Sequence, residues 1–247
     1  MKEKIRRLLV FGDIHGMWYK FKNVYSKVQF DPETDMIVIL GDYLDRGSQP
    51  VPVMEWVLSH YGNKNMIFLR GNHEQMFYEA MTTHMTKDNI AEVLEKSPKG
   101  VWYRNGGRET LMGLKESGKV EKLTSEWLKL IEKMPCYHEV ETNGKEYWFV
   151  HGDCTPDVPL KAQNPEQLLW ERELVLYPRR HKGEQVIVVG HTPVQAIGFR
   201  PYPQWLQDDK LVLMDTGSFM NNGRISCADL ISKKVYQSDW SVNAMTD

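Results

Sequence analysis

The sequence has little cysteine and no long apolar run. Its 247 residues include three cysteines, and no two of them form a CxxC pair. An odd number without this spacing argues against a disulfide framework and against a zinc knuckle, and it favours a reducing compartment. No apolar stretch approaches the roughly 18 residues that a helix needs to span a bilayer. We therefore expect a cytoplasmic protein without a membrane partner.

The sequence also lacks an excess of charge of one sign, internal repeats, linkers and low-complexity tracts. Its formal net charge is -2. This near balance gives no electrostatic reason to expect a nucleic-acid surface. The length is sufficient to bury a substantial core. We expect one domain over residues 1–247 that acts as a monomer.

What the sequence does contain is a series of six short apolar runs, each closed by a glycine or by a residue type that binds metals. The runs are LLVF, MIVIL, MIFLR, YWFV, VIVV and LVLM, which begin at residues 8, 36, 66, 147, 186 and 211. Runs of this composition closed by glycine predict buried β-strands. Two further strands are expected at residues 224–228 and 234–236.

Helical periodicity follows the early runs. Apolar residues recur with helical spacing within residues 18–28, 53–57 and 76–81. This alternation of strand and helix predicts an α/β fold with right-handed crossovers and a largely parallel first half. A charged helical excursion is expected at about 85–135, with signals near Ile90, Leu111 and Trp127. Asn164 and Pro165 mark the start of a later helix.

Five of the predicted strand ends carry residue types that bind divalent metals. These residues are Asp13 and His15, Asp42, Asn72 and His73, His151, and His191. Ligands collect at the carboxyl ends of strands in open α/β sheets. Oxygen ligands combined with neutral imidazoles suit manganese, iron or zinc. We therefore predict a metal site whose ligands come from separate strands.

The spacing within this set indicates how two metal ions could share it. Asp13 and His15 would point to the same side of an extended segment because side-chain direction repeats every two residues. Asp42 ends the next strand and is placed to bridge both ions. The second ion would be completed by Asn72, His151 and His191. Alone, Asp13 or Asp42 could equally be a turn or helix-capping residue, so the interpretation depends on the joint pattern.

Five motifs match a known family in order and spacing. They are DIHG at 13–16, GDYLDRG at 41–47, RGNHE at 70–74, HGD at 151–153 and GHTP at 190–193. Together they resemble the phosphoprotein phosphatase branch of the calcineurin-like metallophosphoesterases. The segments NGG at 105–107 and WERE at 170–173 are most similar to the bacteriophage lambda and bacterial Ser/Thr protein phosphatases. The resemblance implies a four-layer αββα sandwich of two mixed sheets with a dinuclear metal site between them.

The resemblance also implies roles for individual residues. The first metal would be bound by Asp13, His15 and Asp42, and the second by Asp42, Asn72, His151 and His191. His73 matches the general acid, and Asp45 matches the carboxylate that orients it. This pairing is chemically sensible, because a carboxylate stabilises the charged imidazole and keeps it protonated near neutral pH.

Arginines complete the set of expected site residues. Arg46 and Arg172 match the family's phosphate-holding arginines, and Arg70 is expected close by. A guanidinium suits this task because its planar donors match phosphate oxygens in pairs. Two alternatives stay open: Arg172 could be a surface arginine of a predicted helix, and Arg70 could pair structurally with an acid.

The implied activity is metal-dependent hydrolysis of phosphate monoesters. Two divalent ions, for which we expect manganese with iron and zinc as alternatives, would lower the pKa of a bridging water for in-line attack without a covalent intermediate. The expected substrate is a phosphorylated protein or a small phosphoester. Rival functions are the hydrolysis of dinucleoside polyphosphates or of nucleic-acid phosphates, and a catalytically silent scaffold. The segment after Asp215-Thr216-Gly217 and the sequence Trp170-Glu171-Arg172 depart from the family pattern, which leaves substrate choice open.

Overall fold

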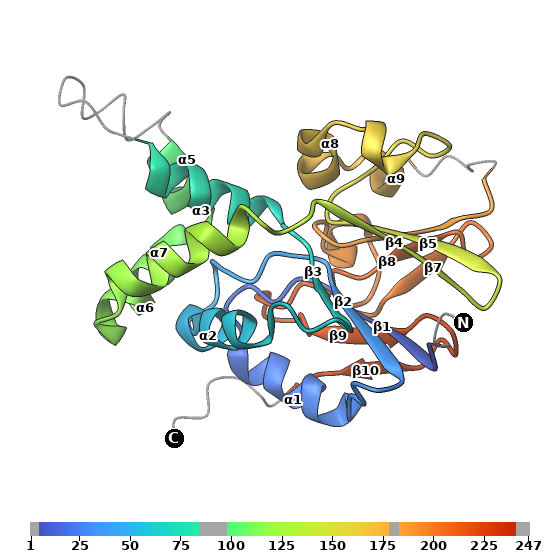
Figure 1. Cartoon of the computed structure of the whole chain (residues 1–247), viewed down its shortest axis with the longest axis horizontal. Coiled ribbons are helices and arrows are strands. Elements are labelled where there is room, and N and C mark those ends of the chain that lie inside the picture. Colours follow the sequence, from blue (N-terminus) through green and yellow to red (C-terminus); the bar gives the residue numbers. More distant parts are fainter. Residues whose placement is uncertain (1–4, 84–97, 178–182, 241–247) are drawn as a thin grey trace.

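The computed structural model describes residues 5–83, 98–177 and 183–240, and these form two mixed β-sheets with helices around them (Figure 1). The first sheet has the strand order β10-β9-β1-β2-β3. Its strands are β1 (Arg7–Phe11), β2 (Asp35–Ile39), β3 (Met66–Phe68), β9 (Ser226–Asp229) and β10 (Val235–Gln237). Strands β1, β2 and β3 are parallel, whereas β9 is antiparallel to β1. The predicted parallel first half is confirmed.

The second sheet has the strand order β4-β5-β6-β8-β7. Its strands are β4 (Tyr137–Thr142), β5 (Lys145–Val150), β6 (Val186–Val189), β7 (Gln204–Leu206) and β8 (Leu211–Leu213). The central strands β5, β6 and β8 are parallel, and β4 and β7 pair antiparallel at the two edges. All six predicted apolar runs therefore lie in or beside observed strands.

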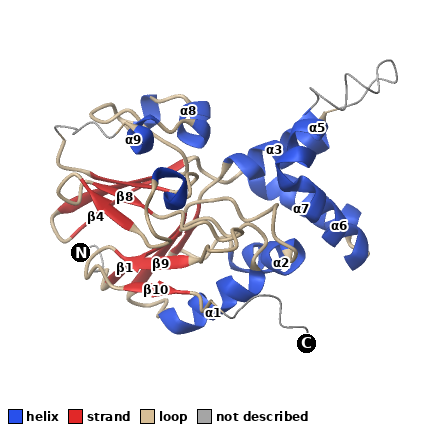
Figure 2. Cartoon of the chain, turned by 180° about the vertical axis from the view of Figure 1, so that it is seen from behind, coloured by secondary structure: helices blue, strands red, loops and turns tan. Residues whose placement is uncertain are grey.

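Both sheets are covered on both faces, and this explains why central strands such as β1, β2 and β6 are largely apolar. In β1, Leu8 and Val10 face the second sheet, whereas Leu9 and Phe11 belong to the core beneath the helices. Figure 2 shows the two sheets stacked, with α1 (Trp18–Val28) and α2 (Pro50–His60) on one outer face. The other outer face carries α8 (Pro165–Trp170) and α9 (Glu173–Leu176). The predicted αββα sandwich is confirmed.

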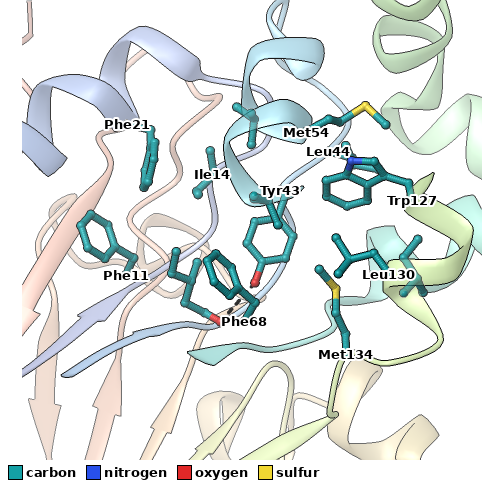
Figure 3. Close-up of a cluster of buried hydrophobic side chains, with 14 of the residues drawn as sticks. Phe11, Ile14, Phe21, Tyr43, Leu44, Met54, Phe68, Trp127, Leu130 and Met134 are labelled. Atoms are coloured by element: carbon teal, nitrogen blue, oxygen red, sulfur yellow. Dashed lines mark hydrogen bonds between the residues drawn. The ribbon is translucent and has the colours of Figure 1, made fainter. Parts of the chain in front are cut away.

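The helical excursion lies to one side of the sheets (Figure 1). It comprises α5 (Pro98–Trp102), the π-helical turn η1 (Tyr103–Gly107), α6 (Arg108–Ser117) and α7 (Val120–Ile131), next to α3 (Asn72–Thr82). Figure 3 shows Trp127 of α7 among the buried side chains of the core that lies beneath the helices. The centroid of its ring lies 6.1 Å from that of Tyr43. The predicted signals near Leu111 and Trp127 are confirmed, and Ile90 lies outside the described residues.

The strand predicted at 224–228 begins too early, and two further strands were missed, each for a physical reason. Strand β9 begins at Ser226 rather than 224, because Thr216 takes both backbone groups of Arg224: its carbonyl oxygen accepts from Arg224 N at 3.1 Å and its hydroxyl donates to Arg224 O at 2.7 Å. Strand β4 was missed because this edge strand alternates exposed glutamates with buried residues. Strand β7 was missed because it is a three-residue edge strand with partly exposed side chains.

Two short 3-10 turns, η2 (Leu160–Ala162) and η3 (Val194–Ile197), complete the described elements. The cysteines Cys136, Cys154 and Cys227 are all free, in agreement with the prediction of no disulfide framework. No helix in the described part of the chain combines the length and the apolar character needed to cross a membrane.

Candidate metal and phosphate site

The predicted metal ligands come together where the two sheets meet the loops that follow their central strands. Asp13 and His15 follow β1, Asp42 follows β2, His151 follows β5 and His191 follows β6. Asn72 begins α3. All six side chains are at most 5% exposed. Burying this many polar groups is costly unless they are paired or coordinate a cation.

Several site residues have a strained backbone. His15, Asp42, Asp45, Arg46 and His191 have φ angles of 47°, 53°, 70°, 67° and 63°. Residues other than glycine rarely adopt this left-handed backbone conformation, and each such residue costs about 1–3 kcal/mol of conformational free energy. The expectation that Asp13 and His15 share an extended segment was therefore wrong. The chain turns at His15 instead, where Ile14 N and His15 N both donate to Asp42 O at 3.0 and 2.8 Å.

A buried glutamate that the sequence analysis did not identify holds the loop after β2, which carries Asp42. One carboxylate oxygen of Glu74 accepts from the backbone N–H groups of Asp42 at 2.8 Å and Gly71 at 3.0 Å, and the other accepts from Tyr43 at 2.9 Å. Burial and the nearby Asp42 charge raise the pKa of Glu74 to about 7. Its position at N3 of α3, where a glutamate completes a capping box, was a usable signal.

Three imidazoles are oriented by backbone carbonyls. Nδ1 of His15 lies 3.0 Å from Leu44 O, and Nδ1 of His151 lies 2.9 Å from Leu40 O. Nε2 of His191 lies 3.1 Å from Trp170 O. A carbonyl can only accept, so each of these nitrogens carries the proton. In the neutral form of each ring, the other nitrogen has its lone pair available to a metal ion. Burial lowers the pKa of His151, but the charge of Asp42 outweighs this effect and raises the pKa to about 9.

Three buried carboxylates lie in one another's electric field. Burial and the charge of Asp215 raise the pKa of Asp13 well above its usual value. Burial also raises the pKa of Asp215 to about 6. Burial alone would raise the pKa of Asp42 too, but the neighbouring His151 and His73 hold it well below its usual value. In both Asp13 and Asp215, Oδ2 is buried and finds no hydrogen-bond partner in the described part of the chain.

These observations fit divalent cations. Two groups of three ligand atoms, each within 4.8 Å of one another, share Asp42: one is Asp42, His151 and His191, and the other is Asp42, His15 and His73. A cation would satisfy the orphaned oxygens and relieve the repulsion between the acids. Asn72 Oδ1 lies 2.8 Å from His151 Nε2, within reach of the same space. Asp215 was missed as a site residue, although it follows the sixth predicted strand.

Arg46 and Arg172 approach the site from opposite sheets. Nη1 of Arg46 donates to His15 Nε2 at 3.1 Å. Nη1 of Arg172 donates to Thr192 Oγ1 at 2.9 Å and to His191 O at 3.2 Å. Burial lowers the pKa of Arg172, and the charges of Asp13 and Asp42 oppose this change.

The prediction that Arg172 lies within a helix was wrong. Helix α8 ends at Trp170, and Arg172 is the non-helical residue before α9. Tertiary hydrogen bonds end α8, because Leu168 O accepts from Gly152 N at 2.7 Å and Trp170 O accepts from His191. The surface-helix alternative for Arg172 therefore loses its premise.

Arg70 is bound to other parts of the chain. Its Nη1 donates to Gln75 Oε1 at 3.0 Å and its Nη2 donates to the carbonyl of Ile131. Its backbone N–H donates to Pro135 O at 2.9 Å. These contacts link β3 to the end of α7. The partners are an amide and carbonyls rather than the acid that the structural alternative supposed.

His73 and Asp45 form the predicted pair. Nδ1 of His73 donates to Asp45 Oδ2 at 2.7 Å, and both residues are at most 1% exposed. Asp45 also accepts a hydrogen bond from Thr110 Oγ1 at 2.7 Å. Trp102 Nε1 lies 3.0 Å from both carboxylate oxygens of Asp45 and donates to them. Trp102 and Thr110 come from the helical excursion, and no local signal marked them. The excursion therefore holds the carboxylate that orients His73.

This arrangement predicts a larger stability loss for Trp102→Phe than for Trp127→Phe. Both indoles are buried, but Trp102 donates to a carboxylate, whereas Trp127 Nε1 has no hydrogen-bond partner among the described residues. Each substitution removes similar packing, so the difference between them reports the hydrogen bond. We expect a difference of about 1.5–3 kcal/mol in the free energy of unfolding, measured by urea denaturation. Equal losses would show that Trp102 matters only through packing.

A family model described as calcineurin-like phosphoesterase matches residues 6–225. The chain is 27% identical over 223 residues to a serine/threonine-protein phosphatase 2 of Salmonella typhimurium. The alignment covers 87% of this chain and 88% of that protein. It is 25% identical to the asymmetrical bis(5'-nucleosyl)-tetraphosphatase PrpE of Anoxybacillus flavithermus, with 84% of each chain covered.

A solved structure supports the same fold. A protein serine/threonine phosphatase from Saccharomyces cerevisiae superposes with a TM-score of 0.56 at 15% identity, covering 96% of this chain and 81% of that one. At this identity the likeness concerns the fold alone.

Proposed function

The chain belongs to the calcineurin-like phosphoesterase family, and we propose that within it the chain is a phosphomonoesterase that acts on phosphoserine and phosphothreonine in proteins. The family implies divalent metal ions, and the site has suitable ligand groups. We propose Asp13, His15, Asp42, Asn72, His151 and His191 as the ligands and manganese as the metal. Bound there, two divalent ions would supply an activated water and positive charge for the phosphoryl group.

The observation that carries this proposal is the buried pair of His73 and Asp45, 2.7 Å apart. A serine or threonine alkoxide is a poor leaving group and needs a proton as the ester bond breaks. The carboxylate holds Nδ1–H, so Nε2 of His73 is left to donate that proton. A polyphosphate leaving group departs readily as an anion and needs such an acid less. The presence of a general acid paired with a carboxylate therefore favours a phosphate monoester over a dinucleoside polyphosphate as the substrate.

The two arginines would hold the phosphate during this reaction. Arg46 and Arg172 flank the candidate metal ligands, through His15 in one case and His191 in the other. Each planar guanidinium can bind two phosphate oxygens at once. Arg70 is occupied by Gln75 and Ile131, so we assign it no direct contact with the phosphate.

The substrate class is tested by parallel turnover assays of the metal-loaded protein. The substrates are a phosphoserine peptide, diadenosine tetraphosphate and a 2′-phosphorylated oligonucleotide. We expect the highest kcat/KM on the peptide. Higher kcat/KM on diadenosine tetraphosphate would contradict the proposal and would favour the activity named for the PrpE relative.

For the arginines, we expect Arg172→Ala to raise both the KM for substrate and the inhibition constant for inorganic phosphate. Loss of a charged hydrogen bond is worth roughly 1.5–3 kcal/mol, or on the order of tenfold to a hundredfold in binding. Arg172→Lys should restore binding only in part, because lysine cannot make the bidentate contact. Arg70→Ala serves as the matched control and should change these constants much less. Unchanged constants in Arg172→Ala would leave Arg172 without a role in phosphate binding.

A further inference from the structure

Phe219 contacts two site residues although it can bind neither a metal nor a phosphate. Its ring lies edge-on to the ring of His15, with centroids 5.1 Å apart at 90°. The Cζ atom of the Arg46 guanidinium lies 4.4 Å from the centroid of the same ring. Phe219 belongs to the loop after Asp215, where the sequence departs from the expected family pattern.

Within the described part of the chain, the Arg46 guanidinium is held by the Phe219 ring and by one hydrogen bond to His15. The backbone of Arg46 is fixed from the helical excursion, where Gly106 O accepts from Arg46 N at 3.0 Å. A Cβ at Gly106 would lie 2.6 Å from Arg46 Cγ, so a glycine is needed for this close approach. The guanidinium itself donates to His15 Nε2. That nitrogen is the one we propose as a metal ligand, so metal binding competes with this hydrogen bond but leaves the ring contact intact.

The loop that carries Phe219 is held by a buried lysine of α1. Lys20 of α1 is 4% exposed, and its Nζ donates to Ser218 O at 2.8 Å and to Gly223 O at 3.0 Å. Burying an ammonium group is unfavourable unless it makes such hydrogen bonds. The two carbonyls lie on either side of Phe219 in the chain. Lys20 therefore fixes both ends of the short segment that presents the ring.

We propose that Phe219 is a positioning residue that keeps the Arg46 guanidinium oriented for phosphate binding, and that Lys20 fixes the loop in the position this requires. The ring face attracts the guanidinium through a cation–π contact. The ring also limits the rotamers of an arginine whose other side-chain partner is lost on metal binding. This inference rests on the proposed role of Arg46.

The test compares Phe219→Leu, which keeps an apolar side chain without a π face, with Phe219→Tyr, which keeps the ring. Phe219→Leu should raise KM and the dissociation constant for inorganic phosphate about 3- to 10-fold, with kcat and metal content near those of the unmodified protein. Phosphate binding is measured by calorimetry on the metal-loaded protein. Phe219→Tyr should restore binding. Lys20→Met should weaken binding in the same direction, because the loop loses both hydrogen bonds.

Trp240→Leu is the matched control, since Trp240 also lies over an arginine, with Arg224 Cζ 4.8 Å from its ring. It should leave phosphate binding unchanged. In an Arg46→Ala background, Phe219→Leu should have no further effect, because the ring acts through Arg46. An additive effect there, or loss of metal in Phe219→Leu, would overturn the inference. If Arg46→Ala itself leaves phosphate binding unchanged, the proposed role of Arg46 fails instead.

Discussion

Asp42→Asn should reduce turnover by several orders of magnitude and lower the occupancy of both metal positions. Asp42 belongs to both candidate ligand groups, and its oxygens lie 3.5 Å from His15 Nε2 and 3.3 Å from His151 Nε2. The neighbouring histidines hold its pKa low, so the carboxylate is charged at neutral pH. Asparagine keeps the shape but removes the charge that two cations would share. Elemental analysis and turnover on a phosphoserine peptide measure the two effects.

Asp35→Asn is the control for neutralising a buried carboxylate elsewhere. The Asp35 side chain is fully buried and pairs with Arg6 and Arg7 at the start of β2. Its loss should lower stability without changing the metal content of the folded protein. Two metals per chain together with near-normal turnover in Asp42→Asn would refute the bridging role.

His73→Asn should lose far more rate on phosphoserine peptides than on an aryl phosphate. A p-nitrophenolate group leaves readily as an anion, so its departure does not depend on an acid. A general acid contributes about 10²–10⁴-fold, and we expect the loss on the peptide to fall in this range. Metal content should stay unchanged. Asp45→Asn should show the same asymmetry with a smaller loss, because it acts through the imidazole that it holds.

The metal content of His73→Asn also decides between two roles for His73. Its Nε2 lies 3.9 Å from Asp42 Oδ2, and His73 belongs to one of the two candidate ligand groups. Loss of metal in His73→Asn, or equal rate losses on both substrates, would make His73 a ligand or a substrate-positioning group. His60→Asn is the control, since His60 lies on α2 and bonds to Trp56 O, and it should leave both rates unchanged.

Most of the fold could be predicted because its signals are local. A buried strand covered on both faces must be apolar at every position, so runs such as VIVV and LLVF are recognisable without knowledge of their partners. Edge strands have no such requirement, which is why β4 and β7 were not predicted from the sequence. The end of α8 was also out of reach, because the groups that end it, Gly152 and His191, are distant in sequence.

The sequence by itself determined which residue types stand at the strand ends, and therefore the kind of chemistry available there. Only the tertiary structure decided how these residues are oriented. The imidazoles are aimed by carbonyls of Leu40, Leu44 and Trp170, and every residue has a carbonyl, so this role leaves no mark in the sequence. Asp45 depends on Trp102 and Thr110, 57 and 65 residues away. Such contacts arise only when the chain has folded, because they join segments that are close in space and remote along the chain.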